Sequence, residues 1–92
     1  MDFRIGDRVR VIRAYQDNIR VVGTEGTVCD LEYHGEPIVS VNHDVYNDFM
    51  HSCHGMCKRG HGWNYPLDTA AQYLELLAPA PTVSIHNIYE LI

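Results

Sequence analysis

The chain has 92 residues, of which 46% are hydrophobic, and it carries a formal net charge of −5 with its histidines neutral. This length gives room for one small hydrophobic core and excludes a second one. The acidic balance disfavours general binding to nucleic acid, because association with a phosphate backbone needs a basic face that releases counterions. No segment has the run of about 18 apolar residues that a membrane-spanning helix requires.

The N-terminus and the cysteine count favour a cytoplasmic protein. The first residues lack the charged, then apolar, then small-residue pattern of a secretion signal. Three cysteines cannot all pair within one chain, which agrees with a reducing compartment. We therefore expect a cytoplasmic location and no membrane partner.

Three β-strands are predicted in the first half of the chain, because apolar and polar residues alternate or β-branched residues cluster there. They cover residues 8–13, 27–32 and 38–42. Gly6-Asp7 is a turn signal before the first strand, and Gly23-Thr24-Glu25-Gly26 precedes the second. A turn at residues 33–37 joins the second and third strands, so these two form a predicted hairpin.

Residues 43–62 interrupt the pattern with a long loop rich in histidine, cysteine and glycine. A loop of this length in a small domain usually has a function or is disordered. A strand resumes at residues 63–65, a helical turn is predicted at 66–72, and a closing strand at 73–77. The elements together predict a mostly-β domain with five strands over residues 1–77.

An apolar tail follows this domain. Residues 78–81 read Ala-Pro-Ala-Pro, a stiff linker, and residues 82–92 are strongly apolar. Exposed apolar surface of this size is unusual in a monomer. We expect the tail to pack on the domain as an extra strand or short helix; the alternative is that it docks on a partner or forms a homodimer with a second copy.

Four segments carry a resemblance to a known type of domain. They are Gly6–Val11, Gly23–Val28, Cys57–Trp63 and Tyr73–Leu77. Together they resemble SH3-like small barrels, including KOW-type modules, over roughly residues 5–77. The Gly60-His61-Gly62-Trp63 piece resembles small uncharacterised proteins of bacteriophages and their hosts. The resemblance implies a five-stranded SH3-like barrel in a phage or bacterial accessory protein, but no particular activity.

The long loop holds the densest set of potential metal ligands. His51, Cys53, Cys57 and His61 follow at spacings that let one loop wrap one ion, and zinc prefers four imidazole or thiolate ligands. A structural zinc would also stabilise a small core that carries a long loop. Two alternatives stay open: histidines that bond backbone groups beside buried cysteines, and a Cys53–Cys57 disulfide, which a reducing compartment disfavours.

Catalysis has weaker support from the sequence. Cys53 beside His54, or Cys57 near His61, would make a thiolate–imidazolium pair. Adjacency in sequence does not supply the geometry or the oxyanion site that such a pair needs. No glycine-rich phosphate loop with Lys-Ser/Thr is present. We expect a protein without enzymatic activity.

The favoured function is protein binding through the long loop and nearby strand ends. Tyr and Trp are common in interface hot spots, and Tyr46 and Phe49 lie in a polar loop where a core position is hard to assign. The predicted contact residues are Asp44, Tyr46, Asp48, Phe49, Met50, Met56, Trp63 and Tyr65. The phage resemblance implies a host protein as partner, such as a nuclease or a defence complex, which the acidic chain would modulate or inhibit.

Two other functions remain open at this point. Arg8, Arg10 and Arg13 lie on one predicted strand and give a local basic face, through which KOW-type barrels bind nucleic acid. The same arginines are more typical of a solvated strand face, which is the favoured interpretation. The third possibility is a zinc-stabilised or Cys/His-dependent enzyme that uses the long loop.

Overall fold

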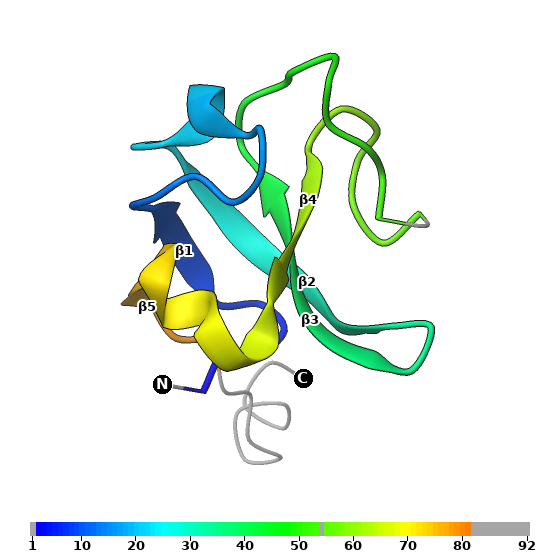
Figure 1. The fold of residues 1–92 in the computed structure, drawn as a ribbon. Helices are drawn as coiled ribbons and strands as arrows, with labels where there is room; N and C mark the ends of the chain where they lie inside the picture. The colour runs from blue at the N-terminus through cyan, green and yellow to red at the C-terminus, as the bar shows by residue number, and fades with distance from the viewer. Residues whose placement is uncertain (1, 54, 82–92) are drawn as a thin grey trace, which may run out of the picture.

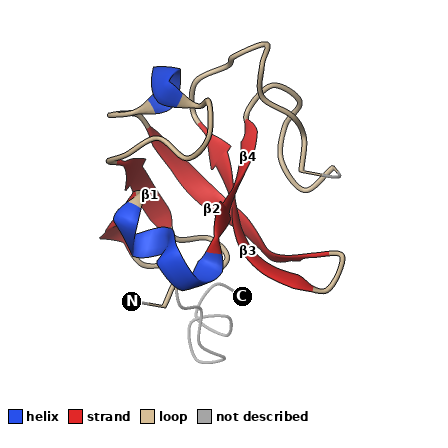
Figure 2. Ribbon diagram, in the orientation of Figure 1, coloured by secondary structure: helices blue, strands red, loops and turns tan. Residues whose placement is uncertain are grey.

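The computed structural model describes residues 2–53 and 55–81, and this part of the chain is mostly β. The strands are β1 (Arg8–Val11), β2 (Glu25–Tyr33), β3 (Glu36–His43), β4 (Gly62–Pro66) and β5 (Leu74–Ala78). Two short 3-10 turns, η1 (Ile19–Val21) and η2 (Leu67–Gln72), lie after β1 and before β5 (Figures 1 and 2). The predicted mostly-β domain with five strands is confirmed. No helix among the described residues is long and apolar enough to cross a membrane.

The five strands form one antiparallel sheet in the order β4-β3-β2-β1-β5. β2 and β3 form the predicted hairpin, with Thr27 opposite Asn42 and Tyr33 opposite Glu36. β1 joins this hairpin to the end of the domain, because Val9 pairs with Gly26 on one side and Leu76 on the other. The tip of the β2–β3 hairpin projects from the rest of the domain (Figure 1).

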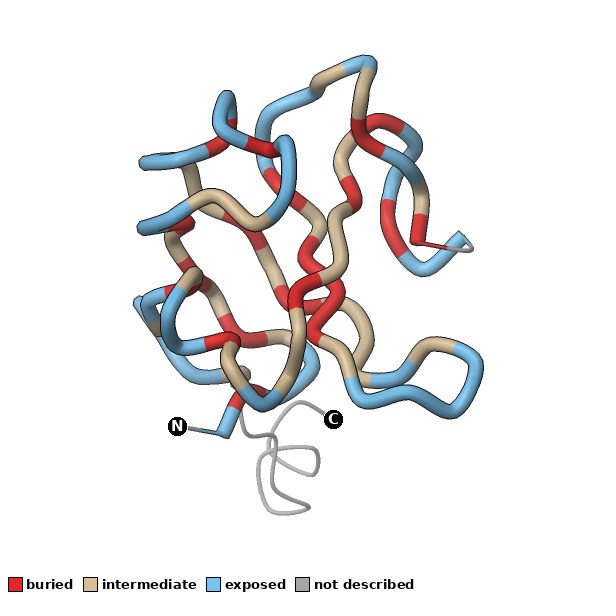
Figure 3. Tube along the Cα trace, in the orientation of Figure 1, coloured by how far each residue is buried: buried red, intermediate tan, exposed pale blue. Residues whose placement is uncertain are grey.

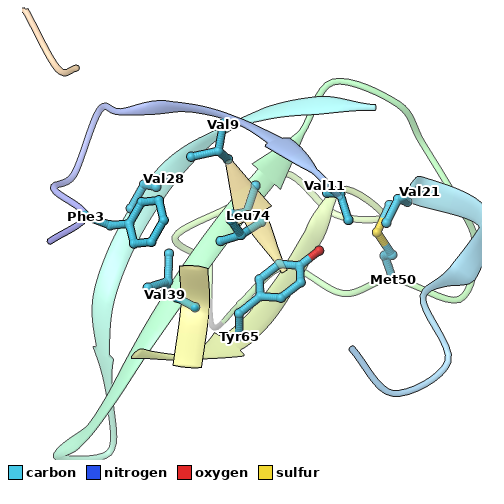
Figure 4. Packing of buried hydrophobic residues seen from close by; sticks show 11 residues of the cluster. Phe3, Val9, Val11, Val21, Val28, Val39, Met50, Tyr65 and Leu74 are labelled. Carbon is cyan, nitrogen blue, oxygen red and sulfur yellow. The ribbon is translucent and has the colours of Figure 1, made fainter. Parts of the chain in front are cut away.

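Buried and more exposed side chains alternate along strands such as β1, and the buried ones form the core. Val9 and Val11 are fully buried, whereas Arg8 and Arg10, which alternate with them, are partly exposed. Buried positions recur along the strands in Figure 3, and Figure 4 shows how the apolar side chains meet. The core consists of Phe3, Val9, Val11, Val21, Val28, Val39, Val41, Met50, Tyr65, Ala70 and Leu74. Burial of this apolar surface is the main force that holds the sheet together.

Several element boundaries differ from the prediction. The first strand ends at Val11 rather than at residue 13, because the Val11 carbonyl accepts a hydrogen bond from Gly23 N–H and the chain then turns away. Ala78, predicted to begin the linker, is the last residue of β5. Ala80 N–H donates a 2.6 Å hydrogen bond to Asp7 Oδ1, so the start of the linker is tied to the domain. The predicted tail, residues 82–92, lies outside the described residues.

Gly26 marks the closest approach of β2 to β3. A methyl group at this position would lie 2.7 Å from Val41 Cγ1 and 2.8 Å from the backbone oxygen of Asn42. A Cβ atom cannot be accommodated at such distances unless the two strands move apart. The second glycine of the Gly-x-x-Gly segment is therefore explained by packing, because a larger residue would collide with β3.

We predict that Gly26→Ala lowers the free energy of unfolding by about 1–3 kcal/mol, the usual range for forcing extra atoms into a packed site. Chemical denaturation monitored by circular dichroism measures this change. Glu32→Ala, at an exposed position on the same strand, is the control and should change stability by less than about 0.5 kcal/mol. Equal stability of the two variants would contradict this account of the strand crossing.

Candidate functional site

An open hollow of about 480 Å³ lies beside β4. Its walls come from the loop after β1, the β2–β3 hairpin, and β4 with the loop before it. The lining residues are Tyr15, Gln16, Tyr33, Glu36, Pro37, Ile38, His51, Trp63, Asn64, Tyr65 and Pro66. A second hollow of about 340 Å³ shares Tyr33, His51 and Asn64 with the first and adds Ser52 and Cys53. We call the two hollows together the aromatic groove.

Trp63 is held in the wall of the aromatic groove by three contacts. Its indole Nε1–H donates a 3.0 Å hydrogen bond to the backbone carbonyl of Tyr15. The His51 ring stacks on the indole, with 5.5 Å between centroids and 21° between planes. Phe49 meets the indole edge-on at 5.7 Å. These contacts fix the indole in advance, which reduces the ordering entropy that a ligand would lose on binding there.

A chain of buried hydrogen bonds runs beneath the groove. Tyr15 N–H donates to Asn18 Oδ1 at 2.7 Å, and Asn18 Nδ2–H donates to the Tyr65 hydroxyl at 2.7 Å. That hydroxyl lies 2.9 Å from His43 Nε2, and His43 Nδ1 lies 2.7 Å from the backbone oxygen of His61. Because a carbonyl oxygen only accepts, Nδ1 of a neutral His43 carries the proton and Nε2 accepts from Tyr65.

Burial keeps this chain uncharged. Asn18, His43 and Tyr65 have no exposed surface. Burial lowers the pKa of His43, against the opposing effects of its hydrogen bond to the His61 carbonyl and of the Asp44 charge. Burial also raises the pKa of Tyr65. Among the described residues, no buried side-chain nitrogen or oxygen lacks a hydrogen-bond partner, so the chain is fully satisfied.

The arginines of β1 are paired with carboxylates. Arg8 lies 2.6 Å from Asp44 and 3.4 Å from Glu25, and Arg10 lies 3.2 Å from Glu75 and 3.6 Å from Glu25. The hydrogen bond from Arg8 lowers the pKa of Asp44. Of the three arginines predicted as a nucleic-acid face, only Arg13 has no ion pair with the described residues. Nearby carboxylates thus offset most of the positive charge on this strand.

The carboxylates of the β2–β3 hairpin differ from those beside β1, because they are not paired with any arginine of the described residues. Asp30, Glu32 and Glu36 have no ion pair with the described residues. Glu36 lines the aromatic groove, and Asp30 and Glu32 line an adjoining hollow that also contains Tyr33 and Cys53. The groove therefore has an acidic border whose charge is available to a basic ligand.

The predicted contact residues of the long loop divide into three groups. Tyr46 and Met56 are 64% and 52% exposed, and Asp44 and Asp48 are also exposed. Trp63 is half-buried and lines the groove, and Phe49 is half-buried below the Arg20 guanidinium, which lies 5.9 Å from the ring centroid. Met50 and Tyr65 are buried. Contact of these last two with a partner stays a prediction; in the described structure Met50 packs in the core and the Tyr65 hydroxyl is satisfied internally.

The cysteines pair differently from the predicted alternative. A disulfide joins Cys29 of β2 to Cys57 of the long loop, and Cys53 is a buried free thiol. The alternative of a Cys53–Cys57 disulfide, which the sequence already disfavoured, is excluded in this structure because Cys57 is bonded to Cys29. Burial raises the pKa of Cys53 to about 11, so little thiolate is present at neutral pH and this thiol is a poor nucleophile.

The four residues predicted to bind zinc are not gathered around one point. His61 Nδ1–H donates to the backbone oxygen of His43 at 2.7 Å, and His51 Nδ1 accepts from Cys53 N–H at 3.0 Å. Among the described residues, no three His, Cys, Asp or Glu side chains are placed to hold a metal ion. His54, from the predicted thiolate–imidazolium pair, lies outside the described residues. Zinc binding by His51, Cys53, Cys57 and His61 stays a prediction.

Of the residues that line the groove, the sequence predicted only Trp63 and Tyr65 as contact residues. Tyr15 and Tyr33 are half-buried and line it, yet they lie in segments that were predicted only as a loop and a turn. Asn18 and His43 were not predicted to be buried, although they complete the hydrogen-bond chain. The available signal was the placement of aromatic residues at strand ends and in loops, where soluble proteins usually place polar side chains.

No protein-family model, curated protein or solved structure matches this chain.

We predict that Tyr65→Phe lowers the stability by about 1–3 kcal/mol, because it leaves Asn18 Nδ2–H and His43 Nε2 buried without a partner. For a domain of this size the midpoint of thermal unfolding should fall by about 4–8 °C for each kcal/mol. Tyr73→Phe is the control, because the Tyr73 ring lies 6.2 Å from that of Tyr65 but its hydroxyl is not part of the chain. Equal effects of the two substitutions would contradict the role of the Tyr65 hydroxyl.

A second prediction concerns pH. Because burial lowers the pKa of His43, the unfolded chain takes up a proton there before the folded protein does as pH falls. The stabilising contribution of neutral His43 is thus complete above about pH 6.5, the ordinary pKa of histidine, and is lost as pH falls below it. Asp44 keeps its charge in this range, since its pKa is lowered.

Thermal unfolding between pH 7.5 and 5 measures this loss. The decline in unfolding midpoint should be smaller in His43→Gln than in the wild-type protein, and it should be retained in His34→Gln, a substitution in the exposed hairpin turn. A decline of equal size in His43→Gln and wild type would show that other groups cause it.

Proposed function

We propose that the chain is a non-enzymatic protein-binding module of the SH3-like barrel type, and that its aromatic groove holds an extended segment of a partner protein. Three features support the barrel assignment. The strand order is β4-β3-β2-β1-β5, β1 pairs with both β2 and β5, and the 3-10 turn η2 directly precedes β5. These features support the SH3-like barrel that the resemblance implies.

The observation that carries the binding proposal is the set of rings in the groove. Tyr15, Tyr33 and Trp63 are half-buried and line one hollow of about 480 Å³. Tyr and Trp side chains offer large rigid contact area with a polar edge. Aromatic-lined grooves of this kind bind proline-rich extended segments, which lose little entropy because they are already extended in solution.

Charge supports a basic ligand. Asp30, Glu32 and Glu36 border the groove without ion pairs to the described residues. Complementary charge speeds association and excludes partners of like charge. A segment that carries arginine or lysine beside its apolar residues therefore fits the groove better than a neutral or acidic one.

The partner we propose is a bacterial host protein, such as a nuclease or a defence complex. Two arguments support this choice: the resemblance of Gly60-His61-Gly62-Trp63 to phage proteins, and the acidic border of the groove. Basic segments of nuclease and defence proteins contact nucleic acid, and an acidic module that occupies one would act as an inhibitor. Nucleic acid itself fits less well, because Arg8 and Arg10 are already paired with carboxylates.

Binding can be measured through Trp63, the single tryptophan of the chain. We predict that a short proline-rich peptide with arginine residues changes the tryptophan fluorescence in a saturable way. A matched peptide with glutamate in place of arginine should bind at least about tenfold more weakly, a difference of about 1.4 kcal/mol. Higher salt should weaken binding of the arginine peptide.

Two substitutions separate the groove from the long loop as the binding surface. Tyr33→Ala removes a ring from the groove and should weaken binding at least about tenfold. Tyr46→Ala removes an exposed ring outside the groove and should leave binding unchanged. Thermal unfolding checks that both variants are folded. Loss of binding in Tyr46→Ala alone would place the surface on the long loop, and absence of binding to every peptide would contradict the proposal.

A further inference from the structure

The three cysteines of the chain converge from two segments. Cys29 of β2 is bonded to Cys57 of the long loop. Cys53 comes close to Cys57 above Gly62, since a methyl group on Gly62 would lie 2.7 Å from Cys53 Sγ and 3.0 Å from Cys57 Cβ. All three sulfur atoms are thus brought to one side of the sheet, although Cys29 is more than twenty residues from the other two in the sequence.

An imidazole nitrogen faces the same cluster. His51 Nδ1 accepts a hydrogen bond from Cys53 N–H at 3.0 Å, so this nitrogen lies beside the cysteine segment and would bind a metal in exchange for that hydrogen bond. The backbone oxygen of His51 would lie 2.7 Å from the same methyl group on Gly62. His61 is held elsewhere, because its Nδ1–H donates to the backbone of His43 and its ring meets Tyr46.

In the disulfide-bonded structure no three His, Cys, Asp or Glu side chains among the described residues are placed to hold a metal ion. We propose that the site forms on reduction, when the protein binds one Zn²⁺ through Cys29, Cys53 and Cys57 as thiolates, with His51 as the fourth ligand. Three thiolates and one imidazole are a common set for structural zinc. In this ligand set Cys29 replaces His61, which the sequence pattern predicts as a zinc ligand. The site shares His51 and Cys53 with the lining of the aromatic groove, but the proposal does not rest on the peptide-binding function.

The disulfide and the metal site exclude each other. A thiol or phosphine reductant supplies two electrons, and with two protons it converts the Cys29–Cys57 bond to two thiols. Zn²⁺ then displaces the protons of the three thiols and undergoes no change in oxidation state. In both states β2 is cross-linked to Cys57 of the long loop, by a sulfur–sulfur bond in the oxidised protein and by the metal in the reduced protein.

The test uses the untagged full chain with and without a phosphine reductant. Native mass spectrometry with Zn²⁺ counts bound metal, and Co²⁺ substitution reports thiolate ligands through their charge-transfer absorption. We expect one metal per chain with thiolate absorption in the reduced protein, and no metal in the oxidised protein. Cys29→Ser and Cys53→Ser should each lose stoichiometric binding, whereas His61→Asn should keep it.

Two results would overturn the proposal. One is a folded, reduced wild-type chain that binds no zinc. The other is a Cys29→Ser variant that still binds one zinc per chain, which would place the metal on His51, Cys53, Cys57 and His61. Circular dichroism checks that each variant is folded. If Cys29→Ser does not fold, the single variants Cys53→Ser and His61→Asn decide the question. Loss of zinc in both of them, or retention in both, would contradict the proposed ligand set.

Discussion

The hydrogen bond between the Tyr65 hydroxyl and His43 Nε2 is the interaction on which the rest of the structure depends. It joins two buried polar side chains on neighbouring strands, and neither can be buried at low free-energy cost unless its remaining polar atoms are also satisfied. Asn18 satisfies Tyr65 from the loop after β1, and the His61 carbonyl satisfies His43 from the end of the long loop. Two loops that would otherwise be free of the sheet are therefore held against it, and they bring Tyr15 and Trp63 together in one groove.

The distribution of charge agrees with a binding role for this groove. The basic residues of β1 are used within the fold, where Arg8 and Arg10 bridge Glu25, Asp44 and Glu75. Such exposed ion pairs contribute little to stability, but they remove the positive face that a phosphate backbone would need. The carboxylates of the β2–β3 hairpin, by contrast, form no ion pair with the described residues. Asp30, Glu32 and Glu36 thus place negative charge at the border of the groove in which the aromatic rings lie.

The sequence predicted the sheet because burial there follows a local rule. Val9 and Val11 alternate with Arg8 and Arg10, and such period-two patterns are readable without a structure. The groove and the cysteine pairing were not predictable in this way. Cys29 meets Cys57, and Asn18 meets Tyr65, only because the strands bring distant segments together. Tyr65 was expected at the surface because nothing in the sequence showed that two loops would satisfy its hydroxyl internally.

The tautomer and charge of His43 test this account most directly. Nitrogen NMR of the imidazole rings in ¹⁵N-labelled protein distinguishes Nδ1–H, Nε2–H and doubly protonated histidine. The account predicts that the pKa of His43 lies below the ordinary histidine value and that the neutral ring carries its proton on Nδ1, with Nε2 accepting from Tyr65. A proton on Nε2, or a His43 that titrates near the ordinary value of about 6.5, would contradict it, because the buried chain of hydrogen bonds could not then run as described.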